Sequence, residues 1–147
     1  MSNDPVVAIV GVTGAVGAEF IATMDRRNFR VGKLKALASA RSAGKTVAFR
    51  GQQVVIEELT ERSFEGVDIA LFSAGGGISR KFAPIAVKAG TVVVDNSSAF
   101  RMDPNVPLVI PPAASGITRA SSPTPTAPPS PRWCRCGRST ARTASSA

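Results

Sequence analysis

The clearest chemical signal in this 147-residue chain is a turn with three regularly spaced glycines, Gly11-Val12-Thr13-Gly14-Ala15-Val16-Gly17. Glycines between a strand and a helix let the backbone turn tightly, approach a pyrophosphate and pack the helix close to the strand. The helix N-terminus adds free N–H donors and a dipole that favours an anion. The pattern lacks the Gly-Lys-Ser/Thr of a phosphate loop, so it predicts a dinucleotide site, the alternative being a turn used only for packing. The expected cofactor contacts are Gly11, Thr13, Gly14, Ala15, Val16 and Gly17.

A second segment, Ser39-Ala40-Arg41-Ser42, indicates which dinucleotide is bound. An NAD site normally places an acidic residue after the second strand, where it holds the ribose 2′-hydroxyl. This segment has no acid, and an arginine beside hydroxyls suits a 2′-phosphate because guanidinium pairs bidentately with phosphate oxygens. We therefore predict NADP as the cofactor, with Arg41 and Ser42 holding its 2′-phosphate; a solvated basic loop is the alternative.

Two more polar segments follow apolar runs, Ser73-Ala74-Gly75-Gly76 and the stretch from Asp95 to Arg101. Ligands of open α/β sheets bind outside the carboxyl ends of the strands, where both segments are expected. Arg101 suits either a phosphate anion or a salt bridge to a nearby acid, Asp95 or Asp103, and spacing does not choose between the two. The predicted cofactor contacts here are Ser73, Ala74, Gly75 and Asn96.

Alternating apolar runs and helical stripes predict the fold that positions these segments. A helix is expected from Ala15 to about Arg26, and a second one around Phe82, which Pro84 should kink or restart. Gly90 is a suitable residue to end that second helix. The order predicts an α/β, doubly wound, Rossmann-type sheet, mostly parallel, with helices on both faces. The expected strands are 6–10, 35–38, 46–49, 53–56, 68–72, 91–95 and 108–110, the third and fourth forming a hairpin.

Composition divides the chain into a dinucleotide-binding domain, residues 1–111, and a tail, residues 112–147. Beyond Ile117 and Trp133 the tail has no large apolar residue, so we predict that it is disordered. It carries five arginines and no acid, which accounts for most of the formal net charge of +8. With Trp133 as its sole aromatic residue, the tail gives little support to nucleic-acid binding.

Several classes of function are disfavoured by what the chain lacks. It has no histidine, and its two cysteines, Cys134 and Cys136, are insufficient for a metal site, so none is expected. No apolar run reaches transmembrane length, and the polar start does not resemble a secretion signal. We expect a cytoplasmic protein that binds NADP and binds neither nucleic acid nor membrane.

Four segments, in order, resemble the N-terminal half of aspartate-semialdehyde dehydrogenase. They are V-A-I-V-G-V-T-G-A-V-G, A-S-A-R-S-A-G-K, L-F-S-A-G-G-G-I-S-R-K-F-A-P and V-V-D-N-S-S-A-F-R-M, within residues 5–111. The resemblance implies an NADP-dependent homo-oligomer that reductively dephosphorylates L-aspartyl 4-phosphate to the semialdehyde, towards lysine, threonine and methionine. It also implies that residues 13–16 contact the pyrophosphate, Arg41 and Ser42 the 2′-phosphate, and Arg101 the substrate phosphoryl group.

The chain departs from this family at the catalytic residues. The family's nucleophile is a cysteine in an Asn-Pro-x-Cys motif, assisted by a histidine of the following domain, and the chain contains neither. No catalytic residue is therefore assigned, and the chain is predicted to be an inactive fragment. The alternatives are a fragment of the related N-acetyl-γ-glutamyl-phosphate reductase and a non-catalytic NADP-binding module.

The tail has a possible origin in a shifted reading frame. If both serines use TCN codons, the codons of residues 120–129 read one base earlier permit Gly-Ile-Ile-Ala-Asn-Pro-Asn-Cys-Ser-Thr. This reading contains the nucleophile motif, with its Cys codon across positions 126 and 127. The hypothesis is that the chain from about Ala120 onward is an out-of-frame translation; a genuine low-complexity tail is the alternative.

Overall fold

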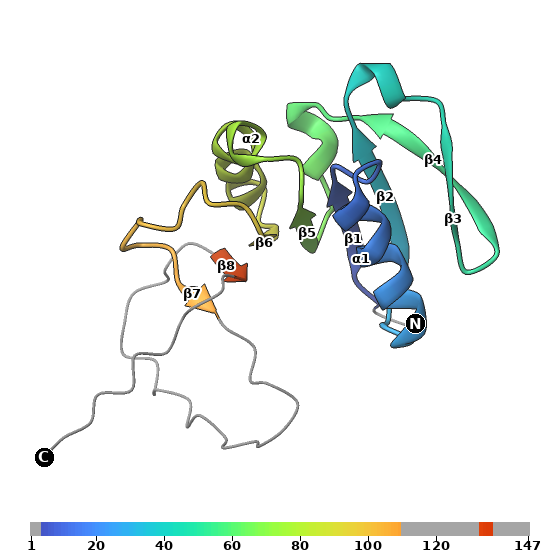
Figure 1. Ribbon diagram of the computed structural model, residues 1–147, viewed down its shortest axis with the longest axis horizontal. Coiled ribbons are helices and arrows are strands. Elements are labelled where there is room, and N and C mark those ends of the chain that lie inside the picture. Colours follow the sequence, from blue (N-terminus) through green and yellow to red (C-terminus); the bar gives the residue numbers. More distant parts are fainter. Residues whose placement is uncertain (1–3, 110–132, 137–147) are drawn as a thin grey trace, which may run out of the picture.

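The computed structural model describes residues 4–109 and 133–136, and its centre is an eight-stranded sheet (Figure 1). The spatial order of the strands is β3-β4-β2-β1-β5-β6-β8-β7. Neighbouring strands are parallel except β3 and β4, which form an antiparallel hairpin at one edge. The strands are β1 Val6–Val10, β2 Lys33–Ala38, β3 Thr46–Phe49, β4 Gln52–Glu58, β5 Ile69–Phe72, β6 Val92–Asp95, β7 Leu108–Val109 and β8 Trp133–Cys136.

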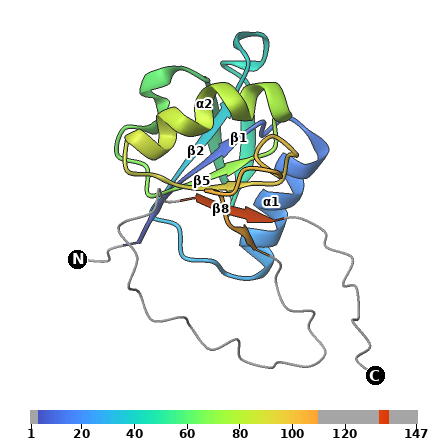
Figure 2. The ribbon, with the colours of Figure 1, turned by 90° about the vertical axis from the view of Figure 1, so that its left-hand side faces the viewer.

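Two helices cover opposite faces of the sheet, α1 (Ala15–Arg26) and α2 (Gly76–Lys88) (Figure 2). Two short 3₁₀ helices, η1 (Ala40–Ser42) and η2 (Glu61–Phe64), follow β2 and β4. This arrangement confirms the doubly wound, mostly parallel sheet predicted from the alternation of apolar runs and helical stripes. The chain order strand, helix, strand places every predicted ligand-binding turn after a parallel strand.

The core has one layer on each side of the sheet, because successive residues of a strand face opposite sides. On the α2 side, the rings of Phe64 and Phe72 stack with their centroids 5.8 Å apart, and both side chains are fully buried. On the α1 side, Ile21 and Met24 of the helix pack against Ile9 of β1. Burial of each such side chain contributes roughly 1.5–3 kcal/mol to folding.

The predicted hairpin is present and has a two-residue turn, Arg50-Gly51. Both residues have positive φ, 50° and 74°, as the turn that matches the twist of paired strands requires. The Arg50 guanidinium donates a hydrogen bond to the Phe29 carbonyl, 2.5 Å away, and lies over the Phe49 ring. These contacts hold the hairpin against the segment that follows α1.

The prediction that Pro84 would kink or restart the second helix is wrong, since α2 runs without interruption from Gly76 to Lys88. Its buried stripe has Phe82 and Ala83 before the proline and Ala86 after it. Packing of both halves against the same face of the sheet compensates for the hydrogen bond that proline cannot donate. Gly90, with φ of +86°, follows the helix end as predicted.

The structure also differs from the sequence analysis at residues 133–136, which were expected to be disordered and form β8 between β6 and β7. Cys134 is in register with Val94 of β6, and Arg135 pairs with both Asp95 and Leu108. The remaining positions of the predicted tail, and Ile110 of the last expected strand, lie outside the described residues. The prediction of a domain boundary at residue 111 therefore stays a prediction.

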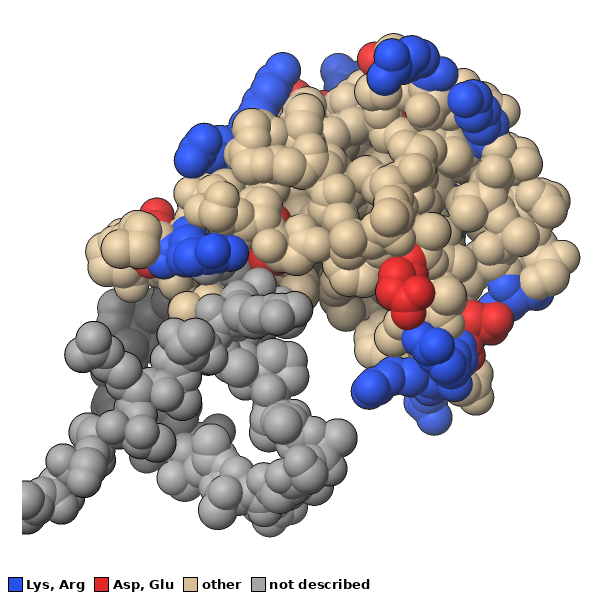
Figure 3. All heavy atoms as spheres, viewed as in Figure 1, with Lys and Arg blue, Asp and Glu red and all other residues tan. Residues whose placement is uncertain are grey.

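Charged side chains are distributed around the surface in separate groups. In the view of Figure 3, lysines and arginines lie at several distant places, with tan surface between them. The described residues form no continuous basic stripe on this face, of the kind that follows a nucleic-acid backbone. Among residues 4–109 and 133–136, no helix is long and apolar enough to cross a membrane.

Candidate dinucleotide-binding site

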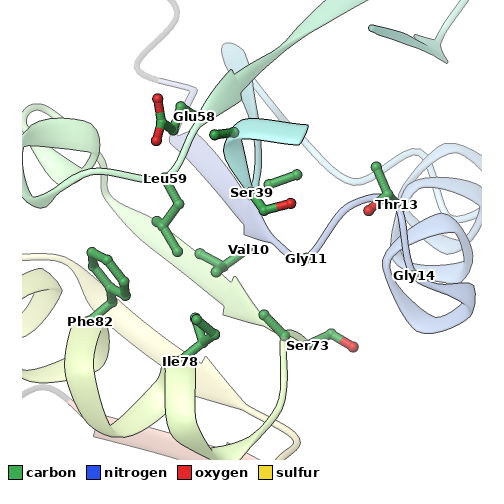
Figure 4. A pocket seen from close by; sticks show the side chains of 13 residues that line it. Val10, Gly11, Thr13, Gly14, Ser39, Glu58, Leu59, Ser73, Ile78 and Phe82 are labelled. Atoms are coloured by element: carbon green, nitrogen blue, oxygen red, sulfur yellow. The ribbon is translucent and has the colours of Figure 1, made fainter. Parts of the chain in front are cut away.

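A pocket of about 510 Å³ opens at the carboxyl ends of the central strands. It lies where β1, β2, β4 and β5 end and where α2 begins (Figure 4). Such a crevice, on a doubly wound parallel sheet, is the usual ligand position in this fold class. The lining residues are Val10, Gly11, Thr13, Gly14, Ala38, Ser39, Ala40, Glu58, Leu59, Ser73, Ala74, Ile78 and Phe82.

Close backbone contacts explain the first glycine of the turn. The Gly11 N–H donates to the Leu37 carbonyl at 2.9 Å, and the Gly14 N–H donates to the Gly11 carbonyl at 3.1 Å. Gly11 has φ of +87°, and a Cβ there would lie 2.7 Å from the Ser73 carbonyl oxygen. Only glycine fits this position, which brings the turn after β1 against the turn after β5 and closes the floor of the pocket.

The N-terminus of α1 is available to an anion. Its first N–H groups have no acceptor within the helix, the N-cap Gly14 supplies no side-chain cap, and the first turn has no acid. Glu19, one turn further along, accepts a hydrogen bond from Arg26 at 2.8 Å, and this pairing lowers the pKa of Glu19. The positive end of the helix dipole, beside Thr13 and Gly14 of the pocket, is therefore not neutralised by its own helix.

Gly17 provides a test of this packing, because a Cβ there would clash with the Gly11 carbonyl oxygen and lie 2.7 Å from the Val12 Cα. We expect Gly17→Ala to lower the free energy of unfolding by about 1–3 kcal/mol, the usual cost of overpacking. Urea denaturation followed by circular dichroism measures this loss. The matched control is Gly77→Ala in α2, where a Cβ meets nothing within 4 Å. Equal effects of the two substitutions would contradict the proposed close contact.

The pocket brings together only part of the predicted cofactor residues. Five line it, from the glycine turn and the loop after β5: Gly11, Thr13, Gly14, Ser73 and Ala74. Six others lie beside it in sequence without lining it: Ala15, Val16, Gly17, Gly75, Arg41 and Ser42. Ala15 and Val16 contribute the first backbone N–H groups of α1, whereas Gly17 is buried against the turn.

The basic segment after β2 reaches the pocket through its first two residues. Ser39 and Ala40 line the pocket, while Arg41, in η1, has an exposed side chain. A backbone hydrogen bond from Ser42 to the Ser39 carbonyl, 2.8 Å long, closes this turn. No hydrogen bond or ion pair joins the Arg41 guanidinium to another residue of the described ranges. Its charge is therefore available to a ligand that extends past Ser39.

The segment after β6 lies against the loop after β5. The Asn96 amide donates to the Ser73 hydroxyl at 3.4 Å, which connects Asn96 to the edge of the pocket. Asp95 is buried and accepts hydrogen bonds from the Ser97 N–H and hydroxyl, both at 2.8 Å.

Arg101 is exposed, and no salt bridge joins it to an acidic residue of the described ranges. The alternative of a salt bridge from Arg101 to Asp95 or Asp103 is therefore not realised here. Asp103 instead accepts hydrogen bonds from Asn105. The Arg101 charge remains available for an anion.

Eight lining residues were not predicted as cofactor contacts. Four of them end strands or belong to the basic segment, Val10, Ala38, Ser39 and Ala40; the other four are Glu58, Leu59, Ile78 and Phe82. Glu58 ends β4, which continues two residues beyond the expected strand end at position 56. Phe82 was assigned to the second predicted helix, and Ile78 and Phe82 are the residues that α2 presents to the pocket (Figure 4). The lining contains no histidine or cysteine, and the described ranges contain no cluster of three potential metal ligands.

A glycine-rich turn between β1 and α1, at the crevice of a doubly wound sheet, defines a dinucleotide-binding domain of the Rossmann class. Residues 6–118 match the family described as semialdehyde dehydrogenase, NAD binding domain. The chain belongs to this family.

Curated relatives named aspartate-semialdehyde dehydrogenase are similar to this chain. The protein from Bacillus subtilis is 56% identical over 105 residues, which cover 71% of this chain and 30% of the relative. The protein from Legionella pneumophila is 52% identical over 119 residues, 81% of this chain and 34% of the relative. These names favour aspartate-semialdehyde dehydrogenase over the N-acetyl-γ-glutamyl-phosphate reductase considered from the sequence. The chain spans about a third of the length of these relatives.

Solved structures agree with this relationship. Aspartate semialdehyde dehydrogenase II from Vibrio cholerae, complexed with ASA, is 50% identical with a TM-score of 0.72; the match covers 75% of this chain and 33% of that one. The enzyme from Candida albicans, solved with NADP, is 27% identical with a TM-score of 0.61, covering 73% of this chain and 33% of that one. Both matches cover about three quarters of this chain.

Proposed function

We propose that this chain is the NADP-binding part of an aspartate-semialdehyde dehydrogenase, an oxidoreductase of amino-acid biosynthesis. The observation that carries the proposal is the pocket at the carboxyl ends of β1, β2 and β5, with the glycine turn as its floor. Its fit to a dinucleotide rests on the start of α1, beside the lining residues Thr13 and Gly14, where no acidic residue of the first turn neutralises the free N–H groups. In the whole enzyme the reaction would be the reductive dephosphorylation of L-aspartyl 4-phosphate, for which the bound cofactor supplies a hydride.

The residues of this chain would bind and orient rather than react. The free N–H groups at the start of α1 would hold the pyrophosphate, and Ser73, with Asn96 hydrogen-bonded to it, would contact the nicotinamide half. Arg101, exposed and without an ion pair in the described ranges, would hold the phosphoryl group of the substrate. The nucleophile and the proton-transferring base would come from parts of the enzyme that this sequence does not contain.

Arg41 supports NADP rather than NAD as the cofactor. We expect the chain to bind NADPH at least about tenfold more tightly than NADH, and Arg41→Ala to remove most of that preference, about 1.5–3 kcal/mol. Fluorescence titration of both cofactors measures it. The control is Arg30→Ala, an exposed arginine that precedes β2 and so lies at the opposite edge of the sheet. Equal affinity of the unsubstituted chain for the two cofactors would refute the assignment.

Other properties follow by analogy with the family. We propose a cytoplasmic protein with a small-molecule substrate, no nucleic-acid partner, and a homo-oligomeric parent enzyme. We also propose that the family segment is continued, from about Ala120, in another reading frame. The family match ends at residue 118, close to this position, which supports the proposal.

A further inference from the structure

Among the described residues, Glu58 is the only acidic one that lines the pocket. Its position is fixed by the backbone on both sides. Within the parallel pair β2–β4, Glu58 is in register with Ala38, and the Leu59 N–H donates to the Ala38 carbonyl at 2.8 Å. The Ser63 hydroxyl contacts the Glu58 carbonyl at 3.3 Å and also accepts from the Thr60 N–H at 2.9 Å. The carboxylate is therefore attached to a well-ordered strand end.

The surroundings of Glu58 correspond to the adenosine half of a dinucleotide. In this fold class the ribose of the adenosine is held from the end of the second strand, which here means Ser39 and Ala40. Beyond these residues the pocket is apolar, with Leu59 on one side and Ile78 and Phe82 of α2 on the other. Figure 4 shows Glu58 at the rim, next to Leu59 and across the pocket from Ile78 and Phe82. A flat, apolar base fits this slot, and its polar edge would reach the rim.

The Glu58 carboxylate is available to a ligand. It is exposed, and no residue of the described ranges pairs with it, because the hydrogen bond from Ser63 uses the backbone carbonyl. An ionised carboxylate can only accept hydrogen bonds. It therefore pairs with a base edge that carries an amino group, and it repels an edge that carries a carbonyl oxygen.

We infer that Glu58 is a specificity-determining residue of the proposed cofactor site, which selects adenine by accepting a hydrogen bond from its 6-amino group. The inference rests on the proposed function. It separates two tasks on adjacent strand ends: the segment after β2 recognises the phosphorylated ribose, and the end of β4 recognises the base. An analogue with a carbonyl oxygen at this position binds more weakly, because that oxygen and the Glu58 carboxylate are both acceptors and neither can donate.

The test uses NADP⁺ and its deamino analogue, in which hypoxanthine replaces adenine. A 6-carbonyl replaces the 6-amino group and N1 carries the proton, so the position proposed to face Glu58 holds an acceptor instead of a donor. Isothermal titration calorimetry of the full chain should show that NADP⁺ binds about tenfold more tightly than the analogue. This ratio is at the lower end of what a hydrogen bond to a charged group contributes to affinity, because the carboxylate is exposed. In Glu58→Gln the ratio should fall to about one, since an amide both accepts from an amino group and donates to a carbonyl. The matched control is Glu57→Gln, exposed on the same strand and outside the pocket lining, which should keep the wild-type ratio.

The outcomes separate this inference from the function on which it rests. If the chain binds NADP⁺ but Glu58→Gln keeps the wild-type ratio within twofold, the role of Glu58 is refuted and the cofactor site remains. If the wild-type chain binds the two compounds equally, the role of Glu58 is likewise refuted and the cofactor site remains. If neither compound binds, the proposed function fails, and the inference fails with it. Matching thermal unfolding midpoints of the three proteins establish that any change arises in the site.

Discussion

The purified 147-residue chain should give no phosphate-dependent reduction of NADP⁺ when supplied with L-aspartate 4-semialdehyde. The sequence has no histidine and no Asn-Pro-x-Cys motif, so the family's base and nucleophile are both missing. The residues that line the pocket are apolar, glycine or hydroxyl-bearing apart from Glu58, and they provide binding without a group that attacks a carbonyl. Loss of an activated nucleophile alone reduces turnover by about 10⁴-fold or more.

A spectrophotometric assay at 340 nm, with the full-length Bacillus subtilis relative as the positive control, measures this difference. Cys134 is the residue most able to overturn the expectation, since it lies in β8, in register with Val94 of β6. A Cys134→Ser variant therefore accompanies the wild-type chain. Clear turnover by the wild-type chain that disappears in this variant would mean that the tail supplies a working nucleophile.

The pattern of local burial accounts for how much of the fold was predictable. The strands β1, β5 and β6 are short apolar runs because both of their faces are covered, and such runs are readable without knowing their neighbours. Their boundaries were predicted to within a residue. Pro84 was misjudged because its effect depends on tertiary packing, which keeps Phe82 and Ala86 on one face of a continuous helix. Local propensity alone does not contain that information.

The candidate site was predictable where a backbone conformation demanded a residue type, as at Gly11. The pocket residues were not predictable where several helices and strands, distant in sequence, come together to line the pocket. Leu59 and Phe82 are far apart in sequence and carry ordinary apolar side chains, so nothing marks them as ligand contacts. Glu58 could have been found, because an acid that ends a parallel strand lies at the ligand-binding edge of the sheet. The expected strand ended too early to place it there.

The sheet also bears on the reading-frame hypothesis, because β6 and β7 are separated by one strand parallel to both. A strand between two others is buried on its edges and is usually rich in β-branched and apolar residues. The written sequence places Trp-Cys-Arg-Cys there, with a charged residue in the strand. The alternative reading of residues 120–123, Gly-Ile-Ile-Ala, is apolar and β-branched, as such a strand requires, and it leads directly into Asn-Pro-Asn-Cys.

Inserting one base upstream of the Ala120 codon should therefore convert an inactive product into an active one, provided that the gene continues in this frame. The expected product has an apolar strand followed by the nucleophile motif, and replacing its new cysteine by serine should abolish turnover by at least about 10⁴-fold. Sequencing of the gene is the first measurement, and the 340 nm assay of the frame-restored protein is the second. The matched control is a synonymous gene with no inserted base. A stop codon in the alternative frame before the codon of Ala147, or the absence of a Cys codon across positions 126 and 127, would leave the tail as a genuine part of this chain.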